Sequence, residues 1–284
     1  MRAWLAQYAM ERASDLNDAL ARLASGPNHW TPFAGGTDLM VVLETGRMPP
    51  RTFLDISRIE ALRGIQVGPD HVTIGALVTY TELLENRVIT TEFPLIADAA
   101  RHTGAVAIQN RGTVGGNIAN ASPAADLPPA LLAYDAEVEL ISIRGTRRLV
   151  YRDFHTGYKQ LDLAPDELIA AVTIPRPRGV WRETYRKVGT RRAQAISKVC
   201  FAARLQVTDG QVSAIRIALG SVAPTVMRAD YADAALIGES LENRVVIRTA
   251  REALEAHIEP IDDIRSSAAY RRRVAGNLLE EFLG

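Results

Sequence analysis

The sequence has little cysteine, no excess charge of either sign and no long apolar run. Cys200 is the single cysteine among 284 residues, so the chain forms no internal disulfide and cannot supply the roughly four thiolates of an iron–sulfur cluster. It lies in the apolar run KVCFAARL, which favours a small, buried residue. The 33 basic residues equal the 33 acidic ones, which argues against a nucleic-acid-binding protein, because such proteins carry a basic excess.

Two further absences concern membranes and metals. No stretch reaches the roughly 18 apolar residues of a membrane-spanning helix, and the N-terminus MRAWLAQYAMERASDL shows no signal peptide. The 5 histidines are scattered, with no pair at metal-ligand spacing. With 47% hydrophobic and 23% charged residues, the composition is that of a globular protein. Neutral charge and scarce cysteine together favour a cytoplasmic location.

The first sixty residues alternate between helix and strand patterns. A helix with Ser14 at its N-cap and Gly26 at its end precedes a short strand at 29–34. A second helix is predicted from Thr37, and a second buried strand at 52–57. This alternation predicts a small parallel α/β unit.

The pattern changes after residue 60. A hairpin is predicted around Pro69–Asp70, and TYTE at 79–82 has the form of a helix capping box. A helix is expected at 94–102, followed by a glycine-rich loop. Two strands joined at Arg144–Gly145 come next.

The segment IPRPRGVW at 174–181 is the best candidate for a domain boundary, because it combines two prolines with a glycine. Beyond it, an Asp209–Gly210 turn predicts a hairpin. Helical patterns occupy 242–258 and 266–283. The basic run Arg271 to Arg273 spans one helical turn, which favours a solvated face over a nucleic-acid-binding patch.

Two glycine-rich segments carry the functional signal: FAGGTDLM at 33–40 and RGTVGGNIANASPAADLPPALL at 111–132. Neither is the G-x-G-x-x-G fingerprint of dinucleotide-binding Rossmann domains, and neither is the G-x-x-x-x-G-K-[ST] P-loop. A nicotinamide-binding domain and a phosphoryl transferase are therefore not favoured.

The residue types in both segments suit a bound phosphate. Gly35 and Gly36 lack a Cβ atom, so a phosphate can reach their backbone N–H groups. A helix that begins near Thr37 would direct its positive end at that phosphate. Thr37 and Thr113 add hydroxyl donors, and Asn117 adds a side-chain amide.

Alternatives remain open for these residues. Asp38 is unfavourable beside a pyrophosphate, so it either caps the helix or accepts a hydrogen bond from a ligand hydroxyl. Either glycine pair alone is most simply a tight turn. Two such pairs, each with hydroxyl and amide neighbours, favour an extended diphosphate ligand held from two sides.

The two segments resemble the FAD-binding signatures of the molybdenum hydroxylase flavoprotein subunits. That family includes the medium subunit of carbon monoxide dehydrogenase and the FAD subunit or domain of xanthine dehydrogenase. The similarity covers NRGTVGGNIANASPAADLPPALLAYDAEVEL, YRKVGTRRAQAISKV and the helical C-terminus, so it extends over essentially the whole chain.

The resemblance implies an α+β architecture. A vanillyl-alcohol-oxidase/PCMH-like FAD-binding fold of two α/β subdomains would precede a smaller α+β C-terminal domain, made of an antiparallel sheet and helices. The FAD-binding domain would span 1–175, with subdomains near 1–58 and 59–175. The carbon monoxide dehydrogenase flavoprotein-like C-terminal domain would span 176–284.

By the same resemblance, the chain carries cofactor-binding residues but no catalytic residue and no metal ligand. The first segment would wrap the diphosphate and ribityl chain with Pro32, Phe33, Ala34, Gly35, Gly36, Thr37, Asp38 and Leu39. The second segment and the loop before it would contribute Thr103, Gly104, Thr113, Gly116, Asn117, Ala119 and Asp126.

Four later positions would complete the cofactor site. Leu168 and Ile169 would make apolar contacts to FAD, and Tyr185 and Lys187 would lie near the flavin ring. Ordinary core packing is the alternative for Leu168, Ile169 and Tyr185, and a surface position is the alternative for Lys187. Thr103 stands where some relatives have an aromatic residue, so the resemblance leaves the stacking partner of the flavin ring open.

The resemblance implies one subunit of a larger oxidoreductase. FAD exchanges electrons both singly and in pairs. The chain would take electrons from an iron–sulfur (2Fe-2S) subunit, which a large molybdopterin subunit supplies, and pass them to an external acceptor. The subunits would form a heterotrimer or its dimer. A nitrogen heterocycle, an aldehyde or carbon monoxide remains open as the substrate.

Two other functions fit the same motifs. A self-contained FAD-dependent oxidase or reductase would need its own acid/base group, and the sequence offers no evident one. A non-enzymatic flavin-binding module is the second alternative, although intact glycine segments argue against it.

Overall fold

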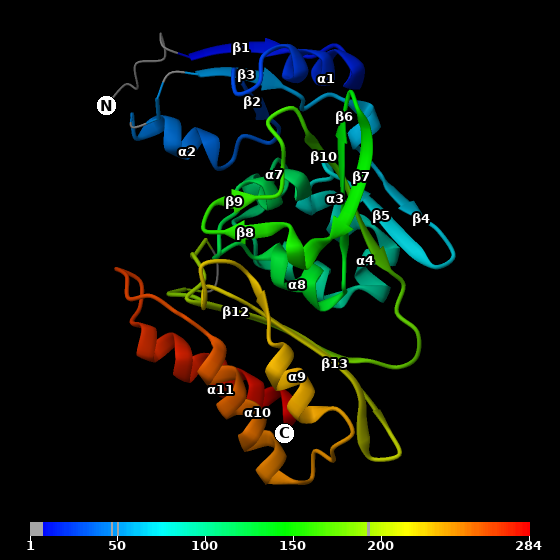
Figure 1. Cartoon of the computed structure of the whole chain (residues 1–284), viewed down its shortest axis with the longest axis vertical. Helices are drawn as coiled ribbons and strands as arrows, with labels where there is room; N and C mark the ends of the chain where they lie inside the picture. Colours follow the sequence, from blue (N-terminus) through cyan, green and yellow to red (C-terminus); the bar gives the residue numbers. More distant parts are fainter. Residues whose placement is uncertain (1–7, 47, 50, 192–193) are drawn as a thin grey trace.

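The computed structural model describes residues 8–46, 48–49, 51–191 and 194–284. Three tiers follow one another along the long axis of the molecule, in sequence order from the N-terminal to the C-terminal end (Figure 1). Each tier is a sheet accompanied by helices. This arrangement confirms the predicted α+β architecture.

The first tier is a parallel sheet, as the alternating sequence pattern predicts. Its strands lie in the order β1 (Tyr8–Arg12), β3 (Arg51–Asp55) and β2 (Trp30–Phe33), and both pairs are parallel. The crossovers contain α1 (Leu16–Ser25) and α2 (Leu39–Glu44). Asp15 caps α1 by accepting from the Asp18 N–H at 2.9 Å, so the predicted cap at Ser14 is wrong by one residue.

Antiparallel pairing builds the second tier. Its sheet runs in the order β4 (Ile65–Val67), β5 (His71–Gly75), β10 (Leu168–Pro175), β6 (Glu137–Ser142) and β7 (Gly145–Val150). Its helices are α3 (Tyr80–Glu85), α4 (Arg87–Glu92), α5 (Pro94–His102), α6 (Val106–Gln109), α7 (Val114–Ala119) and α8 (Leu127–Ala133). A small ribbon pairs β8 (His155–Gly157) with β9 (Gln160–Leu161). Single 3₁₀ turns lie at Glu60–Leu62 and Tyr151–Asp153.

Strand β10 joins the first two tiers because both of its faces are buried. Leu168 and Ala170 belong to the hydrophobic cluster that includes Leu54 of β3. Ile169 and Val172 belong to the cluster beneath the helices of the second tier. Leu168 and Ile169 therefore pack into two different cores, as the alternative for these residues predicted.

Local signals place several second-tier elements correctly. The capping box is present, with Glu82 N–H donating to Thr79 Oγ1 at 3.2 Å and Thr79 N–H donating to Glu82 Oε2 at 2.6 Å. The hairpin at Pro69–Asp70 joins β4 to β5. The prediction of a glycine-rich loop is wrong for Gly115 and Gly116, because both lie inside the short helix α7.

The third tier is an antiparallel sheet backed by helices. Its strands are β11 (Arg182–Val188), β12 (Val199–Thr208), β13 (Gln211–Gly220) and β14 (Met227–Arg228), in that order. Its helices are α9 (Asp230–Leu236), α10 (Arg244–His257) and α11 (Ala268–Leu283). Asp209 and Gly210 both have positive φ at the β12–β13 turn, which is the backbone form that the Asp-Gly pair predicts.

The sheet of the third tier is covered on both faces. Along β12, Val199, Phe201 and Ala203 pack into the core with α9, α10 and α11. Cys200 and Ala202 point the other way, into the core of the second tier, as the period of a strand requires. Cys200 is fully buried, which confirms its prediction as a small buried residue.

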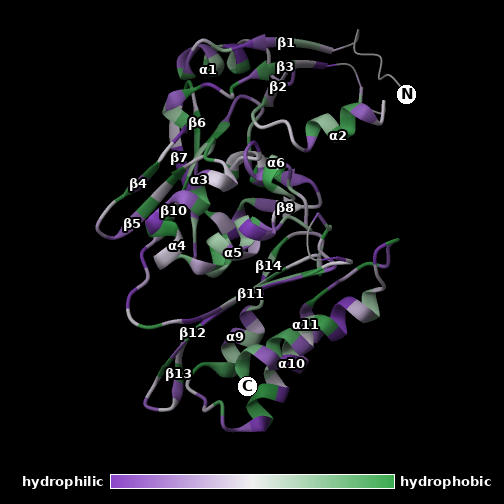
Figure 2. Cartoon of the chain, turned by 180° about the vertical axis from the view of Figure 1, so that it is seen from behind, coloured by the Kyte–Doolittle hydropathy of each residue, from purple (hydrophilic) through white to green (hydrophobic). Residues whose placement is uncertain are grey.

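The prediction of a solvated face at Arg271 to Arg273 is wrong for Arg271. Figure 2 shows hydrophobic and hydrophilic residues interleaved along α10 and α11, as expected of helices with one buried face. Arg271 lies on the buried face and is 3% exposed. Its guanidinium donates to Asp263 Oδ1 at 2.8 Å and to the carbonyls of Lys198 and Ser221. These acceptors compensate the burial of its charge.

Candidate functional site

The two glycine segments touch each other in the folded chain. Gly35 follows strand β2, and a Cβ atom at this position would overlap the carbonyl oxygen of Arg111 and lie 3.3 Å from Gly112 Cα. The Arg111 Nε–H also reaches the Gly35 carbonyl at 3.4 Å. Only glycine allows this approach, so the structure brings together the two motifs that the sequence places in one site.

Packing and backbone conformation also require glycine at other positions of the two segments. Gly36 has φ +73°, and a Cβ there would overlap the ring of Phe33. A Cβ at Gly115 would lie 2.7 Å from that of Ala76. Gly116 differs, because it is exposed. Apart from its chain neighbours and its own helix backbone, Thr113 Oγ1 is the one atom of the described residues within 4 Å of its Cβ position, at 2.8 Å. Gly116 is therefore the glycine that the chain's own packing explains least.

In the second segment, the backbone N–H donors at the helix start are already paired within the chain. At the start of α7, the N–H groups of Val114 and Gly115 donate to carbonyls of Val78 and Ala76. The Gly116 N–H donates to Thr113 Oγ1 at 3.1 Å, so Thr113 acts here as a helix cap and an acceptor. The start of α7 therefore has no free N–H group for an anion, whereas the sequence suggested that both segments bind phosphate.

The first segment offers the free donors. Within the described part of the chain, the N–H groups of Gly36, Thr37 and Asp38 make no hydrogen bond. They precede α2, whose N-cap residue Asp38 makes no side-chain capping bond, so the capping alternative for Asp38 is wrong. Successive free N–H groups form a concave anion site. This run fits a diphosphate group.

Two buried polar atoms without partners lie beside the second segment. Tyr80, the first residue of α3, is 2% exposed, and its ring faces Gly112. Neither its hydroxyl nor Asn117 Oδ1 makes a hydrogen bond among the described residues. Burial and the Asp126 charge raise the pKa of Tyr80, while the nearby Thr103 and Asn117 side chains lower it. Unpaired polar atoms of this kind are expected where a ligand completes a site.

The sequence analysis missed Tyr80 as a site residue. Its position in the TYTE capping box explains the start of α3 but says nothing of the hydroxyl. Thr103 and Gly104 form the turn after α5, where Thr103 Oγ1 donates to the Ala99 carbonyl at 2.8 Å and Gly104 has φ +58°. The Thr103 side chain of this turn lowers the pKa of Tyr80, against the effect of burial.

Asp126 lies at the junction of the second and third tiers, just before α8. Its carboxylate accepts from Lys187 Nζ at 2.6 Å and from Ser197 Oγ at 2.9 Å. Burial raises the pKa of Asp126, and the charge and hydrogen bond of Lys187 oppose this rise. The Lys187 side chain is 7% exposed and also donates to the His102 carbonyl at 2.8 Å. The surface alternative for Lys187 is therefore wrong.

Tyr185 is buried beside Asp126. Its hydroxyl donates to the Asp126 carbonyl at 3.0 Å and lies 3.2 Å from Cys200 Sγ. Its ring stacks with that of His102 at a centroid distance of 5.9 Å. Core packing describes this tyrosine, as the alternative allowed.

The remaining predicted residues surround the first segment or lie on α7. Pro32 is an exposed residue of β2, and Leu39 packs against Leu43 and Phe53. Ala34 packs against the first-tier core. Ala119 is exposed at the end of α7.

A cleft of about 700 Å³ opens between the first tier and the second, next to both glycine segments. Ala34 and Gly35 line it on one side, and Arg111 and Thr113 line it on the other. Basic residues outnumber acidic ones on its walls, which include Arg12, Arg58, Arg63, Arg111, Asp55 and Glu82. A positive excess inside a cleft attracts anionic ligands.

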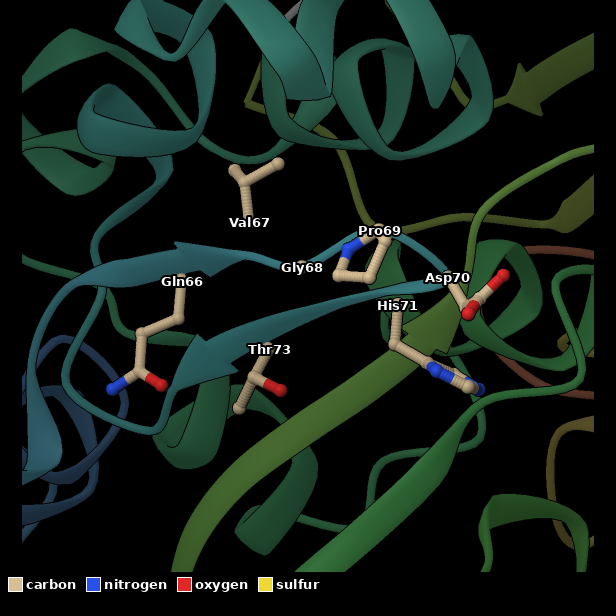
Figure 3. Close-up of a pocket in the computed structure, with 7 residues that line it drawn as sticks. All are labelled: Gln66, Val67, Gly68, Pro69, Asp70, His71 and Thr73. Atoms are coloured by element: carbon tan, nitrogen blue, oxygen red, sulfur yellow. The ribbon is translucent and has the colours of Figure 1, made fainter.

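A second hollow, of about 340 Å³, lies at the β4–β5 hairpin (Figure 3). Gln66 to His71 and Thr73 line it, and none of these residues belongs to a glycine segment. It therefore stands apart from the cofactor-binding candidates. Among the described residues, no cluster of potential metal ligands occurs, and no helix is long and apolar enough to cross a membrane.

Comparisons with known proteins agree with this geometry. Residues 6–177 match the family described as "FAD binding domain in molybdopterin dehydrogenase". Residues 183–284 match the family described as "CO dehydrogenase flavoprotein C-terminal domain".

Similar proteins match over nearly their full length. The glyceraldehyde dehydrogenase medium chain of Sulfolobus acidocaldarius is 31% identical over 94% of this chain and 94% of its own. The xanthine dehydrogenase FAD-binding subunit of Escherichia coli O157:H7 is 32% identical over 92% of this chain and 89% of its own. In structure, the carbon monoxide dehydrogenase of Hydrogenophaga pseudoflava superimposes with a TM-score of 0.92 at 29% identity, over 96% of this chain and 95% of the other.

Proposed function

We propose, because this chain belongs to the family of FAD-binding medium subunits of molybdenum hydroxylases, that it passes electrons from the iron–sulfur clusters of a partner subunit through FAD to an external acceptor. Membership makes the chain a flavoprotein and an oxidoreductase subunit. The observation that carries the proposal is the meeting of the two glycine segments beside a run of free backbone N–H groups.

The residues of the site have separate roles in this proposal. The N–H groups of Gly36, Thr37 and Asp38 would bind the diphosphate, because they have no partner within the described chain. Asn117 and Tyr80 would supply polar atoms that burial leaves unpaired.

The other predicted residues would frame the cofactor. Tyr185 and Lys187 would lie near the flavin ring. Thr103 and Gly104 would contribute from the loop before the second segment, and the remaining residues would shape the surrounding walls. FAD, once bound, exchanges electrons singly and in pairs, which suits a link between one-electron and two-electron partners.

The proposed partners are a 2Fe-2S subunit and a large molybdopterin subunit, in a heterotrimer or its dimer. Relatives of this chain are named as medium chains or subunits of larger enzymes, which supports this assembly. The names cover glyceraldehyde, xanthine and carbon monoxide at about equal identity. We infer that the substrate is selected by another subunit, so the aldehyde, heterocycle and carbon monoxide classes remain open.

Two further features belong to the same proposal. We propose that the FAD-binding domain spans 1–175 and the C-terminal domain spans 176–284. The boundary lies in the proline-containing segment before β11. We also propose a cytoplasmic location, on the basis of the single cysteine and the balanced charge.

Purification of the chain from its native host tests this function. The protein is expected to be yellow, to release FAD and not FMN on denaturation, and to co-purify with a cysteine-rich iron–sulfur subunit and a molybdenum subunit. Colourless protein that takes up no added FAD would overturn cofactor binding. A homo-oligomer that oxidises a substrate unaided would instead favour the self-contained oxidase.

A further inference from the structure

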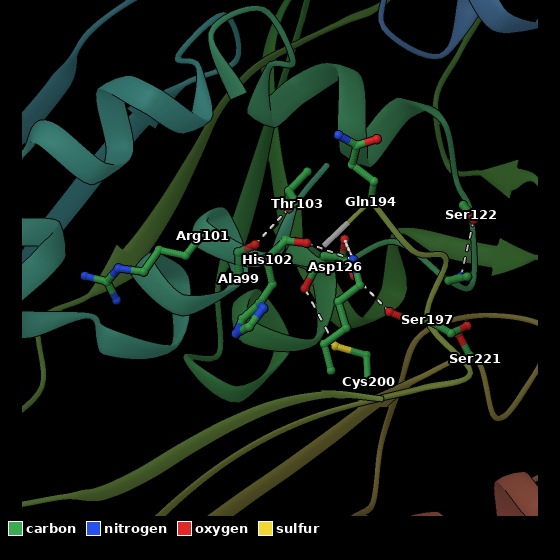
Figure 4. A network of polar contacts seen from close by, with 12 residues as sticks. Ala99, Arg101, His102, Thr103, Ser122, Asp126, Gln194, Ser197, Cys200 and Ser221 are labelled. Atoms are coloured by element: carbon green, nitrogen blue, oxygen red, sulfur yellow. Dashed lines mark hydrogen bonds and ion pairs between the residues drawn. The ribbon is translucent and has the colours of Figure 1, made fainter. Parts of the chain in front are cut away.

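A single buried carboxylate joins the C-terminal sheet to the turn beside the second glycine segment. Asp126 accepts from Ser197 Oγ on one oxygen and from Lys187 Nζ on the other. Figure 4 shows Asp126 between His102 and Ser197, with Cys200 close by. Lys187 lies near the end of β11 and Ser197 just before β12. The carboxylate therefore holds both ends of the β11–β12 connection.

Ser197 is held in place from the side of the C-terminal helix. It is 1% exposed, and its carbonyl accepts from Ser221 Oγ at 2.9 Å. Arg271 of α11 donates to the carbonyls of Lys198 at 2.8 Å and Ser221 at 3.1 Å. The backbone around Ser197 is thus held in place, and from it the hydroxyl reaches Asp126 Oδ1 at 2.9 Å.

The other side of the carboxylate reaches the expected flavin position. Lys187 Nζ bridges Asp126 Oδ2 and the His102 carbonyl. His102 directly precedes Thr103 and Gly104, which the family resemblance counts among the FAD-binding residues, and Lys187 itself is expected near the flavin ring. A chain of polar contacts therefore runs from α11 through Ser197, Asp126 and Lys187 to this turn.

We propose that Ser197 is a positioning residue of the FAD site, which acts by orienting the Asp126 carboxylate so that Lys187 holds the 103–104 turn in its binding form. Through this contact the C-terminal domain completes a cofactor site built mainly by the second tier. The inference rests on the proposed function, because it presupposes that FAD binds at this site.

The groups that shift the Asp126 pKa predict the effect of removing the Ser197 hydroxyl. Burial raises the Asp126 pKa, whereas Lys187, Ser197 and His102 lower it. Tyr80 of α3, Tyr185 of β11 and Cys200 of β12 also face it, and its charge raises the pKa of each. Without the Ser197 hydroxyl the carboxyl binds a proton more readily, so Lys187 loses its partner at a higher pH.

The test compares FAD binding by the full chain in the wild type, Ser197→Ala and Ser142→Ala. Ser142 is a matched control, since it is 6% exposed and, among the described residues, its hydroxyl bonds only the Arg144 N–H in the β6–β7 hairpin. FAD dissociation constants are measured by flavin fluorescence between about pH 5 and pH 8. Melting of the apo-proteins is measured in parallel.

Ser197→Ala is expected to bind FAD about tenfold more weakly at neutral pH, as for one lost bond to a charged group. The deficit is expected to grow as the pH falls, while Ser142→Ala follows the wild type. Equal affinities and equal pH profiles of all three proteins would overturn the inference. A wild type that takes up no FAD would instead overturn the proposed function, and the inference with it.

A second variant covers the case in which Ser197→Ala fails to fold. Asp126→Asn keeps the shape of the side chain but removes the titrating group. Its FAD affinity is expected to be low and to lose the part of the pH dependence that the wild type shows in this range. An Asp126→Asn protein with the wild-type pH profile would contradict the assignment.

Discussion

The carbonyl oxygen of Arg111 fills the space that a Cβ atom would occupy at Gly35. This close approach fixes the contact between two motifs that lie far apart in the sequence. It also changes the meaning of the first glycine pair. Gly35 is needed for the chain to meet itself, and Gly36 for a backbone turn with φ +73°. In the proposed function, the cofactor would use the N–H groups that this turn leaves free.

Gly116→Ala is expected to weaken FAD binding by tenfold or more, because a methyl group would enter the exposed surface beside Asn117. Alanine gains about 0.5–1 kcal/mol over glycine in a helix. Crowding of Thr113 Oγ1, 2.8 Å from the new Cβ, costs a similar amount by disturbing a cap worth about 1 kcal/mol. Apo-protein melting should hardly change, and equilibrium dialysis with FAD gives the affinity. Unchanged affinity would remove Gly116 from the site.

Gly35→Ala is the contrasting variant. Its Cβ would push the two glycine segments apart, so both the apo-protein's melting temperature and its FAD content should fall. A Gly35→Ala protein that melts like the wild type would contradict the close contact with Arg111. Calorimetry of the apo-protein decides this directly.

Gly36→Val is expected to destabilise the apo-protein as well as remove FAD. A β-branched residue with positive φ costs about 1–3 kcal/mol, and the side chain would overlap Phe33. Urea unfolding of the apo-variant measures the fold term, and an apo-stability equal to the wild type would show that the turn is not required.

Tyr80→Phe is expected to leave the apo-protein as stable as the wild type or more stable, because it removes a buried hydroxyl without a partner. FAD affinity should fall, because the proposed site uses this hydroxyl as a polar contact to the ligand. Tyr151→Phe is the matched control, since the Tyr151 hydroxyl bonds His155 Nε2 at 2.9 Å. That variant should lose about 1 kcal/mol of apo-stability and keep its FAD. Identical behaviour of both variants would contradict the assignment.

Asp233→Asn is expected to change how stability depends on pH. Burial raises the Asp233 pKa from its ordinary 3.8 to about 6, against the opposing Arg228 charge. The folded state therefore holds this proton more tightly than the unfolded state. Its stabilising effect is full below pH 3.8 and is lost as the pH rises through about 6.

The total effect is about 3 kcal/mol, from a rise of about two pKa units. Replacing Asp233 removes this falling slope. Unfolding curves of wild type and variant at several pH values should therefore differ most in slope between about pH 4 and pH 6. Parallel pH profiles would show that the carboxyl titrates near its ordinary value.

The sequence alone determined the local elements and the family. The capping box at Thr79 and the hairpin at Asp209–Gly210 formed as predicted, because neighbours in the chain decide both. The two glycine segments sufficed to identify the FAD-binding family, since their residue types and order carry it without knowledge of any distant contact.

The tertiary structure decided how distant residues use one another. Strand β1 escaped prediction because its residues are mostly exposed and show little alternation; pairing with β3 makes it a strand. Arg271 reads as a surface charge, yet Asp263 and two carbonyls from the β-sheet connections accept its hydrogen bonds and permit its burial. Asp126 likewise acquires Lys187 and Ser197 only when the third tier docks. Burial and pairing depend on segments far apart in the chain, and no local pattern records them.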